Sequence, residues 1–437
     1  MGKITGLKRV VVTGLGLITP LGLDVATTWK AMLDGKSGID WIANWGDLDA
    51  VKEKYNLPDD FPFIAGEIKG FNIKDLIKQR KPGYTREDLK QVKYMDPFIQ
   101  FADAAALEAV ADSGANLESG EIDPNRVGVI IGSGQGGIQT LETEFNRLLK
   151  GKKVSPFLIP REIPNLAAGN ISISFKAKGI NACLVTACAS GTHASADAFQ
   201  RIQTGKEDAI LCGGAEASIT PLTVSGFHAL RALSPRFDSP KTASRPFDKD
   251  RNGFVMSEGA GVLILEEREH ALVRGANIYA EVVGCGMTGD ASHITDPDTD
   301  GAVRCMRAAL KDAGIKPEDV DLINPHATST PKGDINEVNA IKTVFGTGRE
   351  KPLITASKSQ LGHSLGAVGA MEAVLCVLSI RDSIVPPVLN LEKIDEQCKG
   401  LNYVRGKSKK ADINVVLSNS FGFGGTNASL IFRKHSG

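Results

Sequence analysis

One cysteine in this sequence lies where a reactive thiol could be positioned. Cys188 belongs to the stretch TACASGTHASADA and is surrounded by Ala, Ser, Gly and Thr residues. Residues 180–185 predict a strand and the small residues that follow predict a helix, so Cys188 falls close to a helix N-terminus. Amide groups and the helix dipole there stabilise a thiolate, the nucleophilic form of cysteine. Buried cysteines are also common as inert core residues, and spacing alone leaves both interpretations open.

A histidine in the same stretch, His193, follows Cys188 by five residues. At 3.6 residues per turn, side chains five positions apart on a helix point about 140° away from each other. We therefore expect His193 to pack or form hydrogen bonds on another face of the helix. Any base that serves Cys188 must come from a distant part of the chain.

Two further histidines lie in turns where a strand leads into a helix. His326, in NPHATSTPKGD, precedes a helix that carries Asp334 and Glu337. His363, in SKSQLGHSLGAVGAMEA, follows Lys358 by five residues and starts a small-residue helix. A single histidine is usually structural, but two in such settings favour a shared site. A metal centre is the weaker interpretation, because there is no HExxH pattern and no carboxylate at ligand spacing.

Two glycine-rich turns are the remaining candidates for part of a functional site. The stretch GSGQGG at 132–137 matches G-x-G-x-x-G after a strand, but no acidic residue follows where a dinucleotide site needs one. A tight turn is therefore favoured over nicotinamide binding. Near the C-terminus, SNSFGFGGTN places Phe421 and Phe423 in a glycine loop between strands, which is either a mobile turn or a plain hairpin.

Strands and helices alternate along the chain, which predicts an α/β architecture with buried sheets. Residues 94–115 predict a long amphipathic helix. The pattern RVVVTGLGLIT at 9–19 has a faint counterpart in YAEVVGCGMTG at 279–289. We therefore predict two similar halves that join near residue 275, with residues 41–92 forming a surface insertion.

The composition narrows the function classes. The 437 residues include 51 basic and 51 acidic side chains, and this balance argues against nucleic-acid binding. The seven cysteines form no CxxC pair and fit reduced thiols better than a disulfide framework. The N-terminal segment lacks a signal-peptide pattern, and no apolar run is long enough to cross a membrane. We expect a cytoplasmic protein without membrane contact.

Six stretches occur together in the order known from one family: TACASG, GGAEASITPL, ASRPFDKDRNGFVMSEGAG, NPHATSTPKGD, SKSQLGHSLGAVGAMEA and SNSFGFGGTN. Through them the chain resembles, over nearly its whole length, the elongating β-ketoacyl-[acyl carrier protein] synthases. The KAS II group is the closer match, with KAS I features in NIYAEVVG and IDEQCKGLN. The resemblance implies a homodimer with a thiolase-type α/β fold. Two similar halves, residues 1–274 and 275–437, would form a five-layer α-β-α-β-α body.

The resemblance also implies a reaction and assigns residues to it. An acyl chain from acyl carrier protein would form a thioester on Cys188 and condense with decarboxylating malonyl-acyl carrier protein, elongating a fatty acid by two carbons. His326 and His363 would assist decarboxylation, and the backbone N–H groups of Cys188 and Phe423 would form an oxyanion hole. The remaining assignments are Lys358 as electrostatic residue, Asp334 and Glu337 in its network, Phe423 as gate, and Phe227 and Gln135 in the acyl pocket.

The resemblance requires no cofactor but implies a structural monovalent cation at Asn324, Glu372, Ser418 and Asn419. Two residues depart from the usual family pattern. Gln135 is polar where the acyl pocket is usually apolar or small, and this leaves the preferred chain length open. Pro325 precedes His326 and stiffens that turn.

Acyl carrier protein is acidic, so the resemblance implies a basic docking rim. The candidates are Arg80, Lys81, Arg86, Lys90, Lys93, Lys152, Lys153 and Arg231, although an ordinary solvated face explains any single one of them. A polyketide-type ketosynthase of the same fold is the nearest alternative function. A thiolase is disfavoured because the C-terminal glycine loop holds no second cysteine, and a non-catalytic carrier-binding scaffold is the alternative from another class.

Overall fold

The strands form one long sheet made of two equivalent sets. The computed structural model describes residues 6–81, 83–115, 122–236, 239–348 and 352–436. The strand order is β12-β10-β9-β14-β15-β8-β1-β7-β6-β4-β5. The N-terminal set consists of β1 (Val10–Ile18), β4 (Val127–Gly132), β5 (Asn181–Ala182), β6 (Ala209–Glu216) and β7 (Gly259–Glu267). The C-terminal set consists of β8 (Ala280–Gly289), β9 (Leu322–Asn324), β10 (Leu353–Ile354), β12 (Asn402–Tyr403), β14 (Val415–Gly422) and β15 (Thr426–Arg433).

The two sets share one pattern of strand pairing. β4 is parallel to β5 and β6, and the pairs β6–β7 and β7–β1 are antiparallel. Correspondingly, β9 is parallel to β10 and β14, and the pairs β14–β15 and β15–β8 are antiparallel. The equivalent strands β1 and β8 join the sets through a short antiparallel pairing of residues 10–12 with 280–282. The faint sequence repeat is therefore a structural repeat, and the prediction of two similar halves is confirmed.

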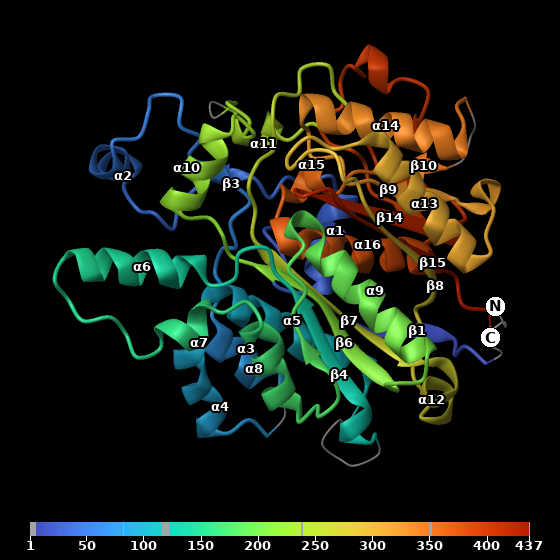
Figure 1. Ribbon diagram of the computed structural model, residues 1–437, viewed down its shortest axis with the longest axis horizontal. Coiled ribbons are helices and arrows are strands. Elements are labelled where there is room, and N and C mark those ends of the chain that lie inside the picture. Colours follow the sequence, from blue (N-terminus) through green and yellow to red (C-terminus); the bar gives the residue numbers. More distant parts are fainter. Residues whose placement is uncertain (1–5, 82, 116–121, 237–238, 349–351, 437) are drawn as a thin grey trace.

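Helices on both outer faces and between the two sets complete five layers (Figure 1). α5 (Pro97–Ser113) and α8 (Leu166–Phe175) cover the N-terminal set, while α13 (Thr299–Ala313) and α14 (Pro331–Phe345) cover the C-terminal set. α9 (Ser190–Gln203) and α16 (Val368–Asp382) contact each other and strands of both sets, so they form the central layer. This is the predicted α-β-α-β-α arrangement of a thiolase-type fold.

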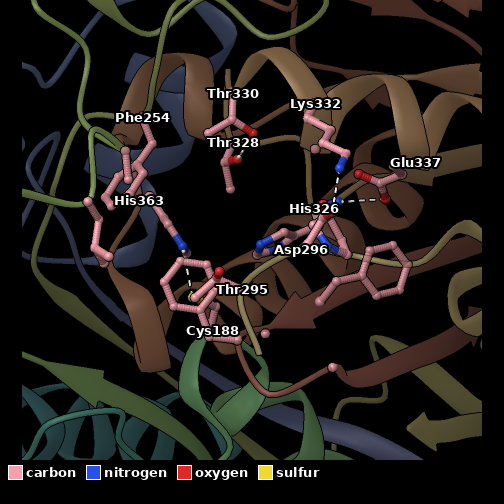
Figure 2. Close-up of a pocket in the computed structure, with 18 of the residues that line it drawn as sticks. Cys188, Phe254, Thr295, Asp296, His326, Thr328, Thr330, Lys332, Glu337 and His363 are labelled. Atoms are coloured by element: carbon pink, nitrogen blue, oxygen red, sulfur yellow. Dashed lines mark hydrogen bonds and ion pairs between the residues drawn. The ribbon is translucent and has the colours of Figure 1, made fainter. Parts of the chain in front are cut away.

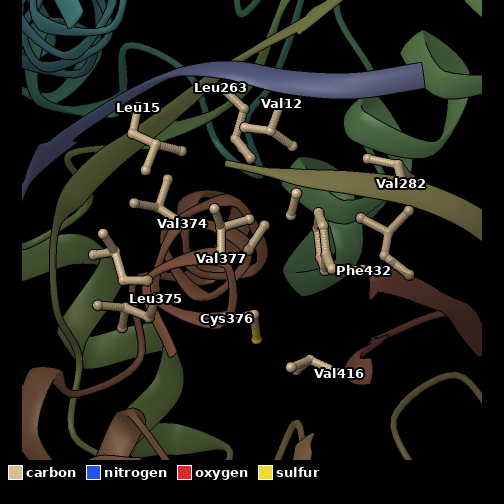
Figure 3. Packing of buried hydrophobic residues seen from close by; sticks show 14 of the residues in the cluster. Val12, Leu15, Leu263, Val282, Val374, Leu375, Cys376, Val377, Val416 and Phe432 are labelled. Carbon is tan, nitrogen blue, oxygen red and sulfur yellow. The ribbon is translucent and has the colours of Figure 1, made fainter. Parts of the chain in front are cut away.

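The central layer lies in the largest hydrophobic core cluster of the described residues. Val374 and Val377 of α16 lie among Leu15 of β1, Val416 of β14 and Phe432 of β15 (Figure 3). All residues of α16 except the last two are buried. A helix that is apolar on every side is buried by its surroundings, and this one is enclosed by both halves of the sheet.

Paired glycines explain the G-x-G pattern in the two equivalent first strands. A methyl group at Gly16 of β1 would overlap the carbonyl oxygen of Ala105 in α5. A methyl group at Gly286 of β8 would likewise overlap the carbonyl oxygen of Cys305 in α13. Glycine is required at these positions because each outer helix lies directly on the strand backbone.

The other elements surround this frame. They are α1 (Val25–Leu33), α2 (Leu48–Tyr55), α3 (Ile73–Arg80), α4 (Arg86–Gln91), α6 (Ile138–Leu149), α7 (Leu158–Glu162), α10 (Pro221–Ala229), α11 (Pro240–Ala243), α12 (Arg268–Val273), α15 (Lys358–Leu361), β2 (Asp40–Trp41), β3 (Ile64–Ala65), β11 (Ile384–Val385) and β13 (Lys409–Lys410).

Three sequence predictions about single elements need correction. The strand expected at 180–185 is only two residues long, because β5 pairs with β4 and then leaves the sheet to form a turn. The helix expected at 94–115 starts at Pro97, since Asp96 caps its N-terminus. The segment 41–92 is more than a surface insertion, because the apolar face of α3 packs against α5.

Some expectations about organisation are not decided by the fold. The boundary between residues 274 and 275 stays a prediction; the chain passes there from β7 to β8 through α12. The first five residues of the N-terminal segment lie outside the described ranges. Among the helices that the structure describes, none combines the length and apolarity needed to cross a lipid bilayer.

Replacing Gly286 by Ala is expected to lower the free energy of unfolding by about 3 kcal/mol, because the methyl group must displace the backbone of α13. Gly289 in the same strand is the matched control. No described atom lies within 4 Å of a methyl group there, so Gly289→Ala should change stability by less than about 1 kcal/mol. Urea denaturation followed by circular dichroism compares the two variants, and equal stabilities would contradict the close packing.

Candidate active site

The candidate residues converge at one edge of the sheet. Cys188 follows β5, His326 follows β9, Lys358 and His363 follow β10, and Phe423 follows β14. All of these except the buried Lys358 line a cavity of about 400 Å³ (Figure 2). In open α/β sheets, ligands bind beyond the carboxyl ends of the strands, and this site occupies that position.

The turn that carries Cys188 is strained and tightly held. Ala187 has a φ of 49°, in the left-handed region that non-glycine residues seldom adopt. The hydroxyl of Ser190 accepts a hydrogen bond from the Thr186 amide at 2.9 Å and donates one to the Ala187 carbonyl oxygen at 2.6 Å. Cys188 therefore lies in a fixed 3-10 turn directly before α9, close to the helix N-terminus as predicted.

His193 supports the same turn from the body of α9. Its Nδ1 atom lies 2.9 Å from Thr186 Oγ1 and 3.2 Å from the Ala189 carbonyl oxygen. Burial lowers the pKa of this histidine. The expectation that His193 forms hydrogen bonds away from the cysteine is confirmed by these contacts.

Cys188 lies close to two histidines that belong to the C-terminal half of the molecule. Its Sγ atom lies 3.1 Å from Nε2 of His363. The rings of His326 and His363 are nearly perpendicular, with centroids 5.3 Å apart. Phe254 packs edge-on against the other side of His363 at 5.2 Å, and the His363 amide donates to the Val255 carbonyl oxygen at 2.8 Å. Both contacts restrict where the His363 ring can point.

The surroundings of the Cys188 thiol and of the His326 and His363 imidazoles keep all three groups uncharged. Burial raises the pKa of the Cys188 thiol to about 12, although the charge of Lys358 and the backbone amides of Phe423 and Cys188 lower it. Burial, and then the charge of Lys358, hold the pKa values of His326 and His363 well below the usual range. A neutral thiol beside a neutral imidazole can transfer its proton to the ring as the sulfur attacks.

Lys358 is a buried charge with one carboxylate partner. The residue is 1% exposed, and its Nζ atom lies 2.6 Å from Oε1 of Glu372. The same oxygen accepts a hydrogen bond from the Ser357 hydroxyl at 2.5 Å. Because a buried charge without a partner is strongly destabilising, the ion pair keeps the lysine charged next to the thiol and imidazoles.

Glu337 and Asp334 hold the turn of His326. Glu337 accepts the N–H groups of His326 and Ala327 at 2.8 and 2.7 Å. Asp334 accepts the N–H group of Ser329 at 3.1 Å, further along the same turn. Burial raises the pKa of Glu337 to about 7 and that of Asp334 to about 6. The hydrogen bond of Lys358 goes to Glu372, while its charge lowers the pKa of Glu337. The place of Asp334 and Glu337 in the network of Lys358 stays a prediction.

An aromatic cluster closes the inner wall of the cavity. Phe227 lines the cavity and packs on Phe254, with ring centroids 5.3 Å apart. Gln135 is not among the described residues that line it, because Thr223 holds its side chain by a hydrogen bond of 3.2 Å. Trp45 and Phe61 of the segment 41–92 extend the cluster. The place of Gln135 in an acyl pocket stays a prediction.

Glu216 is a site residue that the sequence patterns did not single out. It is fully buried at the end of β6 and accepts the N–H groups of Gly134 at 2.7 Å and Gly366 at 3.0 Å. It thereby ties the GSGQGG turn to the turn of His363, and its charge raises the pKa of Cys188. An acidic residue at the end of an apolar strand, in GGAEAS, is the signal that could have indicated it, since burial requires several donors.

The four residues expected around a monovalent cation fall into two groups. Asn324, Glu372 and Ser418 each have a buried polar atom without a hydrogen-bond partner among the described residues. Asn419 points to the opposite face of β14, where its Nδ2 atom lies 3.2 Å from Oε1 of Glu337. The free oxygens of Glu372 and Ser418 fit a cation, whereas Asn419 could offer only its carbonyl oxygen.

The expected basic rim is only partly available for docking. Arg80 donates to the carbonyl oxygens of Ala104 and Leu23 and so anchors α3. Arg231 is exposed and lines the cavity mouth. Lys332, which the sequence patterns missed, also lines the mouth and pairs with Asp296. Its position in the first turn of α14 after the NPHATSTP stretch was the available signal.

The fold and site define a condensing enzyme of the thiolase-like class. The domain models of β-ketoacyl synthases match residues 7–271 (N-terminal domain) and 279–392 (C-terminal domain). The 3-oxoacyl-[acyl-carrier-protein] synthase 2 of Staphylococcus aureus (strain COL) is 47% identical over 431 residues, 98% of each chain. The chain belongs to the β-ketoacyl synthase family, and the predicted resemblance to its elongating members is confirmed.

Solved structures agree with this assignment. A β-ketoacyl synthase from Burkholderia phymatum STM815 superimposes with a TM-score of 0.87 at 35% identity, covering 98% of this chain and all of that one. A ketosynthase solved in complex with its type II polyketide acyl-carrier protein and bound to the hexaketide gives 0.85 at 34% identity, covering 98% and 100%. The relatives thus include both fatty-acid and polyketide enzymes.

The double variant Lys358→Met/Glu372→Gln removes a positive charge near Cys188 without leaving Glu372 unpaired. We expect the pKa of the Cys188 thiol to rise, so that iodoacetamide labels it about tenfold more slowly near pH 8. The labelling rate, measured by mass spectrometry across pH, should shift to higher pH. Cys183 is the internal control, because Lys358 is not among the groups that act on its pKa. An unchanged Cys188 profile would refute the role of Lys358.

Proposed function

We propose that this chain is an elongating 3-oxoacyl-[acyl-carrier-protein] synthase of type II fatty-acid synthesis. It would join a Cys188-bound acyl group to the two carbons that remain when malonyl-acyl carrier protein loses CO2. The observation that carries the proposal is the 3.1 Å contact between Cys188 Sγ and His363 Nε2, with His326 beside it in the same cavity. The similarity to the staphylococcal enzyme supports this substrate class.

In the first step, Cys188 accepts the acyl chain. The sulfur attacks the thioester carbonyl, and His363 takes the thiol proton at Nε2, which is free because burial keeps the ring neutral. The bond between the acyl carbon and the sulfur of the carrier protein then breaks, and His363 returns the proton to the thiol that leaves. The backbone amides of Cys188 and Phe423 point at the sulfur and are suited to stabilise the oxyanion that forms beside it. Phe423 is 40% exposed in a glycine hairpin, a position from which it can admit or exclude the acyl chain.

In the second step, malonyl decarboxylation leaves an enolate. His326 and His363 lie where they can donate hydrogen bonds to its oxygen, each worth about 3–4 kcal/mol by analogy with oxyanion-hole donors. The enolate carbon attacks the acyl-cysteine carbonyl, and the thiolate of Cys188 leaves. Lys358 stabilises the departing thiolate electrostatically. The aromatic wall excludes water that would hydrolyse the thioester.

A polyketide-type ketosynthase is the second candidate, favoured by the similarity to the polyketide enzyme described above. The higher identity to the fatty-acid enzyme favours the first. Assays with long saturated acyl chains and with polyketone intermediates on carrier protein separate the two. The polar Gln135 is the residue to exchange in that comparison, since Gln135→Ile would restore the apolar pocket more usual in the family.

We also propose the setting in which the enzyme works. Acidic acyl carrier protein would dock at the cavity mouth near Arg231 and Lys332. A structural monovalent cation would be held by Oε2 of Glu372 and Oγ of Ser418, the two oxygens there without a partner among the described residues. The seven described cysteines are free thiols, which is consistent with the reducing cytoplasm.

The variant Cys188→Ala is expected to abolish acyl transfer and condensation, because the nucleophile is lost, while malonyl decarboxylation continues with both histidines in place. Gas-phase measurement of CO2 release and chromatography of the condensation product report the two steps separately. Cys183→Ala, a half-buried cysteine outside the cavity lining, should retain both activities. Condensation by the Cys188→Ala variant would refute the proposal, whereas a wild-type protein that does not condense would favour a non-catalytic scaffold.

A homodimer is proposed from an exposed apolar face on α6 and the segment after it. Monomeric proteins seldom leave such a face in water. Its exposed side chains are Leu141, Phe145, Leu148, Leu149, Val154, Ile159 and Ile163. A second copy would cover it around a twofold axis and would also support the GSGQGG turn at the start of α6.

The double variant Phe145→Asp/Leu148→Asp is expected to be monomeric, because two carboxylates cannot be buried unpaired in the interface. Light scattering after size exclusion measures the mass. Val273→Asp is the control, since that residue is 90% exposed on α12 and lies outside the proposed interface. A dimer that survives the double substitution would place the interface elsewhere.

A further inference from the structure

The residues at the bottom of the cavity also form a set of metal ligands. Cys188 Sγ and one ring nitrogen each of His326 and His363 all lie within 4.8 Å of one another. One thiolate and two imidazoles are a typical donor set for Zn²⁺, with a water molecule at the fourth tetrahedral position. The sequence contains no metal motif for this set, because the three ligands come from turns after β5, β9 and β10 and lie together only in the folded protein.

We propose that Cys188, His326 and His363 bind a thiophilic divalent cation such as Zn²⁺, and that the bound ion reversibly blocks the enzyme by occupying its nucleophile. This site lies beyond the proposed reaction, which needs no divalent metal. An ion reaches it through the same cavity that the acyl chain uses.

The binding step balances without any co-reactant. The S–H bond of Cys188 breaks, a sulfur–zinc bond forms, and one proton is released to solvent. A neutral imidazole binds the ion through its unprotonated ring nitrogen, so the two histidines lose no proton. The buried carboxylates of Glu337 and Glu372 offset part of the added positive charge that Lys358 opposes.

Two features make this a reversible site rather than a resident metal centre. Tetrahedral zinc requires ligand atoms separated by about 3.3–3.7 Å, so the His326 ring must move inward on binding. In resident sites the second ring nitrogen of each histidine is hydrogen-bonded. Here Nδ1 of His326 and Nδ1 of His363 have no partner among the described residues. Neither ring has the second hydrogen bond that orients a histidine in a resident metal site, so we expect an affinity that an ordinary chelator overcomes.

Titration with Co²⁺, a spectroscopic substitute for zinc, tests the site directly. The wild-type protein should show a thiolate-to-cobalt charge-transfer band and the visible bands of a tetrahedral ion, saturating at one ion per chain. Cys188→Ala should abolish the charge-transfer band, and His326→Ala should weaken binding at least tenfold. Cys183→Ala is the matched control and should bind as the wild type does, because Cys183 lies outside the triad. Zn²⁺ should displace the cobalt spectrum.

A second measurement checks that the ion covers the nucleophile. Zn²⁺ should protect Cys188 from iodoacetamide, EDTA should restore labelling, and protein acylated on Cys188 beforehand should bind no cobalt. A charge-transfer band that persists in Cys188→Ala, or no band in the wild type, would overturn the proposal. The spectra do not depend on turnover, so this outcome is distinct from a failure of the condensation assay.

Discussion

The candidate active site is arranged around one buried positive charge, that of Lys358. Lys358 is buried and forms an ion pair with Glu372, and its charge acts on the thiol and both imidazoles. It favours a thiolate at Cys188 and neutral rings at His326 and His363, which is the combination that nucleophilic attack requires. A surface lysine could not have this effect, because solvent would screen it. We therefore expect the ion pair between Lys358 and Glu372 to determine how reactive the thiol of Cys188 is.

The repeated fold explains how the charge and the nucleophile come to lie together. β5 and β10 are equivalent strands in the two halves, and each leads through a turn into a central helix. The first turn carries Cys188 and the second carries Lys358 and His363. Because α9 and α16 pack against each other between the sheets, the two turns meet at one edge. Glu216 then joins the neighbouring turns by accepting amides from both halves.

The sequence alone predicted the features that depend on residues close to one another along the chain. Helical periodicity placed Cys188 at a helix start and excluded His193 as its base, and the G-x-G repeat indicated the duplicated fold. It failed where contacts join distant segments. The partner of Lys358, the role of Glu216 and the hydrogen bond that turns Gln135 toward Thr223 depend on how loops from both halves pack. Such contacts leave no periodic signal in one chain.

A thiol with a pKa of about 12 is almost fully protonated at neutral pH, yet burial favours the proposed reaction. The same lack of water that raises the thiol pKa lowers those of both histidines, so His363 is always ready to accept the proton 3.1 Å away. In the proposed reaction, negative charge develops only when the sulfur of Cys188 attacks a carbonyl carbon. The hydrogen-bond donors around the developing oxyanion stabilise it strongly, because the site excludes water. A free thiolate would instead react with any electrophile that entered the cavity. Because Cys188 and both histidines are uncharged before a substrate binds, the site is selective for a bound carbonyl group. The charge of Lys358 stabilises the thiolate of Cys188 during the proposed reaction.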